Sequence, residues 1–168
     1  MARFRAATGA RLPTLPPGGE YLLNIWESAV YPMARERGVT MKLPPLQPRS
    51  RLALEAAEFA RDAGKFVVMH AAIFRAFFED GRDIGNLETL LELGVAAGLA
   101  RSELQSALTT GQFRARVLAD EALAGALGVC GVPAILLRRE GESLTEARTL
   151  SGAQPEVILR SAIQSLLA

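Results

Sequence analysis

The feature that most constrains this fold is a short segment of glycines and a proline near the C-terminal end of the sequence. It reads Gly128-Val129-Cys130-Gly131-Val132-Pro133-Ala134 and separates a stretch of helical periodicity from the apolar run Ala134–Leu137. Proline has no N–H to give to a sheet ladder, so it occurs at the first residue or the edge of a strand. We therefore expect a helix to end at Gly128 and a buried strand to begin after Pro133.

The peptide bond between Val132 and Pro133 has two readings from local chemistry. An X-Pro bond is the one kind of peptide bond in which the cis form costs little, although the trans form is commoner. One hypothesis is a cis bond that presents backbone polar groups at a surface site. The alternative is an ordinary loop with a trans proline beside a strand.

Cysteine, histidine and charge content exclude several classes of function. The sequence contains one cysteine, Cys130, and one histidine, His70, which excludes an intrachain disulfide and makes a zinc site or a Ser-His-Asp triad improbable. Its 19 basic and 18 acidic residues create no net field toward nucleic acid or an anionic membrane. Charges interrupt every long apolar stretch, and no apolar signal core follows the basic start. We expect no nucleic-acid or membrane partner, no metal, and a cytoplasmic location.

Most of the chain has helical periodicity. Apolar residues recur at spacings of three and four from Glu20 to about Arg37, where Pro32 should kink or split the helix near Tyr31. Ser50 and Asn86 are predicted N-caps for later helices. The segment 65–78 is apolar on several faces, which is typical of a helix buried on more than one side. The expected helices are 20–37, 51–63, 65–78, 87–97, 102–109 and 112–127.

The C-terminal part changes character. Residues 134–138 and 144–150 are strand candidates joined by a turn that contains Gly141, which predicts a β-hairpin. Pro155 then occupies the first turn of a last helix. A further weak strand or extended segment is expected at 39–43.

The order of these pieces resembles a known family. The segment Gly128–Ala134, followed by Ser151-Gly152-Ala153-Gln154, is similar to the DsbA-like superfamily of thioredoxin-fold proteins. Its FrnE branch, the 2-hydroxychromene-2-carboxylate isomerases and the kappa-class glutathione transferases are the most similar. An Ala-rich helix ending at Gly64, an aromatic helix ending in Phe77-Phe78-Glu79-Asp80-Gly81, and then Asp83-Ile84 and Leu90 to Gly98-Leu99 also match. The resemblance covers residues 20–168 and implies a cis bond before Pro133.

The resemblance implies an α/β fold, an incomplete thioredoxin-like fold with an inserted α-helical subdomain. We expect a single DsbA-like domain over 1–168, with an N-terminal remnant and linker at 1–49, a helical insertion at 50–127, and a C-terminal β-hairpin and helix at 128–168. Members of the family begin with a strand and a Cys-x-x-Cys motif at a helix N-terminus, where the thiolate is stabilised. This sequence has no such motif, and it resembles a member that begins one strand-helix unit late.

Three functions follow from that reading. The first is a truncated or degenerate relative of the thiol-disulfide oxidoreductases that has no dithiol but binds peptides or protein partners. In it Gly131, Val132 and Pro133 form the substrate-binding loop and Val132 pairs with extended substrate. The second is monothiol chemistry at Cys130, for instance a mixed disulfide with glutathione, against which stands a structural or idle thiol. The third is a glutathione-dependent, kappa-like isomerase or transferase, whose nucleophile is expected on the unit that this sequence does not contain. No other cofactor is expected.

The same resemblance predicts an assembly. Without the first strand, the edge of Ala134–Arg138 is unpaired, and an apolar edge invites pairing with another chain. We expect a homodimer or swapped oligomer, or an N-terminus rebuilt so that Arg3–Ala6 fills the gap.

Overall fold

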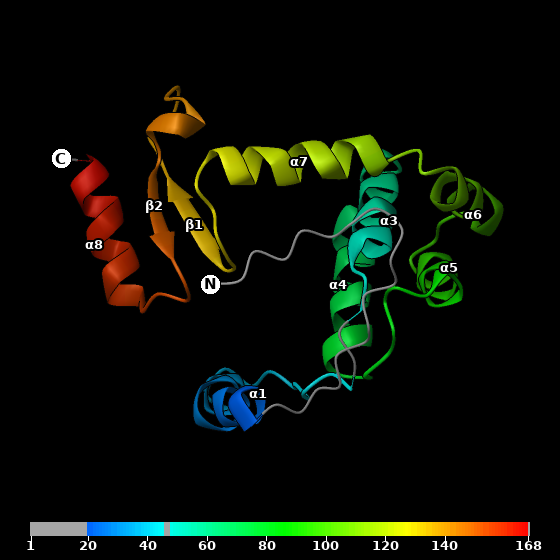
Figure 1. Cartoon of the computed structure of the whole chain (residues 1–168), viewed down its shortest axis with the longest axis horizontal. Coiled ribbons are helices and arrows are strands. Elements are labelled where there is room, and N and C mark those ends of the chain that lie inside the picture. The colour runs from blue at the N-terminus through cyan, green and yellow to red at the C-terminus, as the bar shows by residue number, and fades with distance from the viewer. Residues whose placement is uncertain (1–19, 46–47, 168) are drawn as a thin grey trace. The chain divides into compact units, whose positions relative to one another are not determined.

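The chain forms two compact units, Met1–Val117 and Leu118–Ala168, in the computed structural model, which describes residues 20–45 and 48–167 (Figure 1). The first unit holds the helices α1 to α6, and α7 (Arg114–Ala126) begins in it and continues into the second. The second unit contains the only two strands of the described residues. The boundaries expected at residues 49 and 127 stay predictions.

The first helical segment is divided where proline requires it. Helix α1 (Glu20–Ile25) runs into a π-helical turn, η1 (Trp26–Val30), and then into α2 (Tyr31–Glu36). The Tyr31 N–H bonds the Trp26 carbonyl five residues back, which widens the turn directly before Pro32. Proline clashes with the carbonyl four residues earlier in a regular α-helix, and a π turn relieves such a conflict. The division near Tyr31 is the one that the sequence predicts.

The core of the first unit lies among α3 (Arg51–Asp62), α4 (Phe66–Phe78), α5 (Leu87–Ala96) and α6 (Arg101–Thr110). Alanines on α3 let the neighbouring helices approach closely, and larger side chains fill the space between them. The fully enclosed apolar members of this core are Ala56, Ala60, Met69, Ala76, Leu90, Leu91 and Leu104. Gly94 on α5 belongs to the same contact, because a Cβ there would lie 2.3 Å from Leu104 Cδ2.

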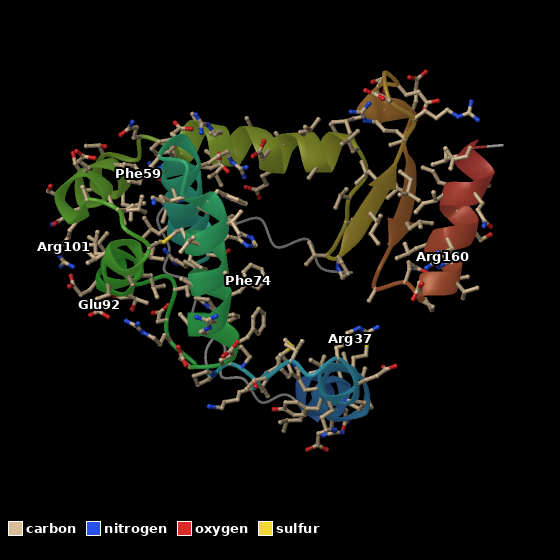
Figure 2. All side chains as sticks on the ribbon, turned by 180° about the vertical axis from the view of Figure 1, so that it is seen from behind. Arg37, Phe59, Phe74, Glu92, Arg101 and Arg160 are labelled. Atoms are coloured by element: carbon tan, nitrogen blue, oxygen red, sulfur yellow. The ribbon has the colours of Figure 1, made fainter. Side chains whose placement is uncertain are left out.

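Helix α4 is buried on one side, and the expectation that it is buried on more than one side is wrong for the described residues. Its core side carries Met69, Ile73 and Ala76. On the outward side Val67 is 78% exposed and Phe74 is 52% exposed. Phe74 projects from α4 away from α5 and α6 (Figure 2). The segment is apolar, but apolar composition alone does not determine how many neighbours a helix has.

The expected helix caps divide into one that is confirmed and one that is wrong. The Asn86 side chain accepts hydrogen bonds from the N–H groups of Glu88 and Thr89, so it caps α5. Ser50 precedes α3, but its backbone is already helical (φ −69°, ψ −12°) and its side chain caps nothing.

Residues 39–43 form no strand. The Lys42 N–H bonds the Phe78 carbonyl, which connects this segment to the end of α4.

The second unit is a hairpin followed by a helix. Strand β1 (Ala134–Leu137) pairs antiparallel with β2 (Arg148–Ser151), in a register that places Ala134 opposite Ser151. Helix α8 (Glu156–Leu167) follows β2, and Arg148 Nη1 donates to Ser165 Oγ at 3.0 Å.

The second strand is shorter than the 144–150 predicted. Residues Leu144–Glu146 form a 3₁₀ turn, η2, because Ser143 and Glu146 make a capping box, in which the Ser143 side chain accepts from the Thr145 N–H and the Glu146 side chain accepts from the Ser143 N–H. The sequence Ser143-Leu144-Thr145-Glu146 carries that signature, and it overrides the β propensity of the apolar and β-branched residues.

Candidate functional site: the Cys130–Pro133 loop

The candidate site is the loop between α7 and β1, and its start is fixed by the end of α7. Gly128 has φ +73°, a left-handed conformation that glycine adopts without steric cost. The Val129 N–H bonds the Ala124 carbonyl at 3.0 Å, and the Gly128 N–H bonds the Gly125 carbonyl at 3.1 Å. These two bonds satisfy carbonyls that the helix end leaves free and turn the chain toward Cys130.

Cys130 is an exposed, free thiol. Its Sγ–H donates to the Gly128 carbonyl at 3.4 Å, the one polar contact that the thiol makes within the described part of the chain. No basic side chain there pairs with it, and no group of three or more His, Cys, Asp or Glu residues among those described is placed to hold a metal ion. The thiol is therefore accessible, and the described residues place no activating base beside it.

The residues after Cys130 form the most exposed part of the loop. The Val132–Pro133 peptide bond is cis. Val132 is 93% exposed, although valine is a residue type that is usually buried. Within residues 20–45 and 48–167, the backbone N–H and C=O of Gly131 and Val132 have no hydrogen-bond partner. The loop thus presents an apolar side chain and free backbone polar groups to solvent.

The turn after β2 holds Pro133 in place. The Gly152 N–H donates to the Pro133 carbonyl at 2.8 Å, and Gln154 Nε2 donates to the Ser151 carbonyl at 2.6 Å. Gly152 has φ +80° and allows the chain to turn there. Sequence reasoning used Ser151-Gly152-Ala153-Gln154 to recognise the family but assigned it no place at the site, and this is the part of the site that it missed.

The bond from Gly152 to Pro133 also defines the two edges of β1. In an antiparallel pair, residues alternate between those that bond the neighbouring strand and those whose N–H and C=O point away from it. Pro133 bonds Gly152, the residue directly after β2, so in the register observed Ile135 and Leu137 face β2. The backbone groups of Ala134 and Leu136 then point to the opposite, outer edge. Val132 lies two residues before Ala134, so the same alternation assigns its backbone groups to the outer edge.

A cleft lies at the other end of β1. Its volume is about 240 Å³, and it is lined by Leu137, Arg138 and Arg139 and by α8 residues that include Ile163 and Leu166. Arg139 Nε donates to the Leu166 carbonyl at 2.5 Å, so this arginine satisfies a carbonyl in the last turn of α8. The cleft contains none of the four candidate residues Cys130, Gly131, Val132 and Pro133.

Comparison with known proteins identifies the family to which this chain belongs. The family model described as a DSBA-like thioredoxin domain matches residues 24–164, which is most of the chain. The chain belongs to the DSBA-like thioredoxin domain family. This confirms the resemblance on which the sequence-based fold class depends; the narrower assignment to the FrnE branch stays an interpretation.

The DSBA-like chain is also similar to one curated relative and to two solved structures. It is 30% identical over 104 residues to the uncharacterized protein YwbO of Bacillus subtilis, an alignment that covers 61% of this chain and 50% of YwbO. A probable DsbA oxidoreductase from Streptomyces coelicolor superposes with a TM-score of 0.74 at 25% identity, covering 89% of this chain and 62% of that one. A putative protein disulfide isomerase from Nitrosomonas europaea gives a TM-score of 0.69 at 23% identity, covering 95% of this chain and 78% of that one.

These likenesses confirm the α/β fold class, a thioredoxin-like DsbA fold with a large helical part. The matched part of the chain spans half the length of YwbO and about three fifths of the Streptomyces protein. None of the described helices of this DSBA-like chain has the length and apolar character needed to cross a membrane.

Proposed function

We propose that this chain is an oxidoreductase-like DsbA-family domain that binds extended protein or peptide segments at the Cys130–Pro133 loop and carries out no dithiol exchange of its own. The observation that supports it most is the exposed Val132, whose N–H and C=O are unpaired in the described residues while the flanking Pro133 is anchored to Gly152. An extended peptide gains affinity from main-chain hydrogen bonds to such groups.

The chemistry of the chain limits what happens after binding. Exchange of a protein disulfide needs an attacking thiol and a second thiol that resolves the mixed disulfide. The sequence supplies one thiol, at Cys130. The chain on its own therefore holds a substrate without completing a dithiol cycle.

Backbone pairing is tested with two peptides that have the same side chains. A fluorescent, extended, uncharged peptide is titrated with the protein, next to a version N-methylated at two consecutive central residues. We expect N-methylation to weaken binding by about tenfold or more, because each lost hydrogen bond contributes about 0.5–1.5 kcal/mol. The variant Val132→Ala, which keeps the backbone groups, should retain the difference. Equal affinity for both peptides would contradict the proposal.

A second candidate is monothiol chemistry at Cys130, favoured by the exposure of this thiol two residues before Val132. The Cys130 thiolate would attack oxidised glutathione, form a Cys130–glutathione mixed disulfide and release one glutathione thiolate. Intact mass after incubation with oxidised glutathione, and insulin reduction with glutathione present, are compared with those of Cys130→Ser. An adduct and an activity that both vanish in Cys130→Ser support this function; inactivity of both proteins supports the binding function without redox chemistry.

A further inference from the structure

The outer edge of β1 is an unpaired β-strand edge in the part of the chain that the structure describes. β1 and β2 form a two-stranded sheet, and the outward backbone groups of Ala134 and Leu136 have no partner among the described residues. A two-stranded hairpin is marginal alone and gains stability from further strands or from a helix. Each β1 residue is only half-buried, although all four are apolar.

Among the described residues, nothing on this edge protects it from another strand. Native sheets commonly block free edges with charges, prolines or bulges. Pro133 does not block this one, because its missing N–H belongs to the side that faces β2 and its carbonyl is the group that bonds Gly152. The composition of β2 is different: Arg148, Thr149 and Ser151 make it a strand suited to an exposed position.

We propose that a second copy of this chain pairs with the outer edge of β1 in an antiparallel, two-fold arrangement centred on Ile135. Ala134 of one copy would exchange both backbone hydrogen bonds with Leu136 of the other, and Ile135 would face Ile135. Two hairpins would then form one four-stranded sheet. The inference goes beyond peptide binding and depends on the edge of β1, not on that function.

Charge decides between the two directions in which the strands can pair. β1 is followed directly by Arg138 and Arg139, and Val132 and Pro133 precede it. A parallel pair would place the arginines of both copies side by side, where like charges repel. The antiparallel pair places them at opposite ends and sets Arg138 of one copy across from Val132 of the other. The uncharged centre, Ala134–Leu137, is left as the contact.

The first test needs no mutation. Sedimentation velocity over a range of concentrations measures the association state, and amide hydrogen exchange is followed at the same concentrations. We expect a dimer in which the amides of Ala134 and Leu136 are protected at high concentration and lose protection on dilution. The amides of Ile135 and Leu137, which face β2, should stay protected throughout.

Two results would overturn the proposal. One is a monomer at every concentration with unprotected Ala134 and Leu136 amides, which means that the edge is open. The other is a monomer in which these amides are protected, which means that another part of the same chain covers the edge. Residues 1–19, to which the expected strand Arg3–Ala6 belongs, lie outside the described residues.

The second test fixes the register with a disulfide. In a Cys130→Ser background, Ile135→Cys places two thiols across the two-fold axis at a non-hydrogen-bonded pair. There the Cα atoms are about 4.5 Å apart, within the range that a disulfide spans. Leu137→Cys is the matched control, since it is equally half-buried on the same strand face but would lie four residues from its counterpart across the pair.

Mild oxidation should give a covalent dimer of the Ile135→Cys protein at least ten times faster than of the Leu137→Cys protein. Equal rates, or faster cross-linking of Leu137→Cys, would contradict the register. Circular dichroism of both variants establishes that they are folded, and the sedimentation result on the unmodified chain stands independently of either variant.

Discussion

At the scale of single residues, the clearest electrostatic contact is the one that joins α3 to α7. Arg116 donates two hydrogen bonds to Asp62, at 2.8 and 3.2 Å, and a third to Glu58 at 3.2 Å. Hydrogen bonding to Arg116 lowers the pKa of the Asp62 carboxyl and, in return, raises the pKa of the Arg116 guanidinium. Folding is therefore favoured by the ionised form of Asp62.

This shift predicts a pH dependence of stability. A carboxyl whose pKa is lower in the folded state stabilises the protein above its ordinary pKa of about 3.9, and loses that effect as the pH falls through the folded-state value. Asp62→Asn should lower the melting temperature at pH 6 by a small amount, because the pair is exposed, and the difference should shrink below about pH 4. Thermal unfolding between pH 2 and 7 measures it, with Asp120→Asn as the control for loss of one exposed carboxylate. A difference that grows on acidification would contradict the assignment.

Glu55 is the buried exception on α3. Its side chain is 1% exposed, and Arg51 Nε lies 3.3 Å from its Oε1 but is not aligned to donate a hydrogen bond. Neither carboxylate oxygen has a hydrogen-bond partner among the described residues. A buried acceptor without a partner costs about 1–3 kcal/mol. Replacement by an apolar side chain of similar length often stabilises such a site.

We therefore expect Glu55→Met to raise the free energy of unfolding, by about 1 kcal/mol. The matched control is Glu58→Met one turn along the same helix, which removes the ion pairs to Arg61 and Arg116 and should give no gain. Urea unfolding measures both. A Glu55→Met protein less stable than the unmodified chain would mean that the Arg51 pair contributes more than its geometry indicates.

Residue-scale features that depend on local chemistry could be predicted from sequence, and those that depend on distant neighbours could not. Pro133 directly before a strand, Gly128 at a helix end and Asn86 as a cap all follow from what these side chains and backbones allow. The burial of Glu55 depends on helices that are distant in the sequence, and its residue type argues against it. The anchoring of Pro133 by Gly152 likewise depends on the pairing register of the hairpin.

At the scale of elements, two helical glycines predict opposite effects of the same substitution. A Cβ at Gly94 would lie 2.3 Å from Leu104 Cδ2, and Leu104 is fully buried and has no room to move. A Cβ at Gly125 on α7 would have no atom within 4 Å, and this residue does not have a positive φ.

Gly94→Ala should destabilise the first unit by about 1–3 kcal/mol, because it overpacks the contact between α5 and α6. Gly125→Ala should stabilise α7 by about 0.4–1 kcal/mol, because it reduces the entropy of the unfolded chain. Chemical unfolding of the two variants gives the comparison. Similar effects of both substitutions would contradict the close approach of α5 and α6.

The helices could be predicted well and the second strand less well, for a physical reason. Helical periodicity extends over ten or more residues, so that one misplaced residue changes little, and Pro32 acts on bonds within its own helix. A strand of four residues offers few positions to read, and the capping box of Ser143 and Glu146 decided the local structure of 143–146 instead. The outward side of α4 shows a third case, because the number of neighbours of a helix is a property of the whole fold.

At the scale of the whole molecule, the two proposals use adjacent parts of one edge and should exclude each other. In the proposed dimer, Arg138 of the second copy lies across from Val132, where a bound peptide would pair. Peptide affinity should then fall as the protein concentration rises through the range of dimer formation, and excess peptide should shift the sedimentation profile toward monomer. Peptide binding that leaves the dimer fraction unchanged would contradict this expectation, because it would mean that the peptide and the second copy bind different surfaces.

Binding of an extended peptide through the backbone of Val132 can be measured by amide hydrogen exchange at that residue. Exchange is measured below the concentration of dimer formation, with and without saturating peptide. We expect the peptide to slow exchange at Val132, by about tenfold or more if one backbone hydrogen bond forms, and to leave the amides near Val67 and Phe74 on the outward side of α4 unchanged. Saturable peptide binding with Val132 exchange unchanged, or with slowed exchange confined to α4, would contradict it.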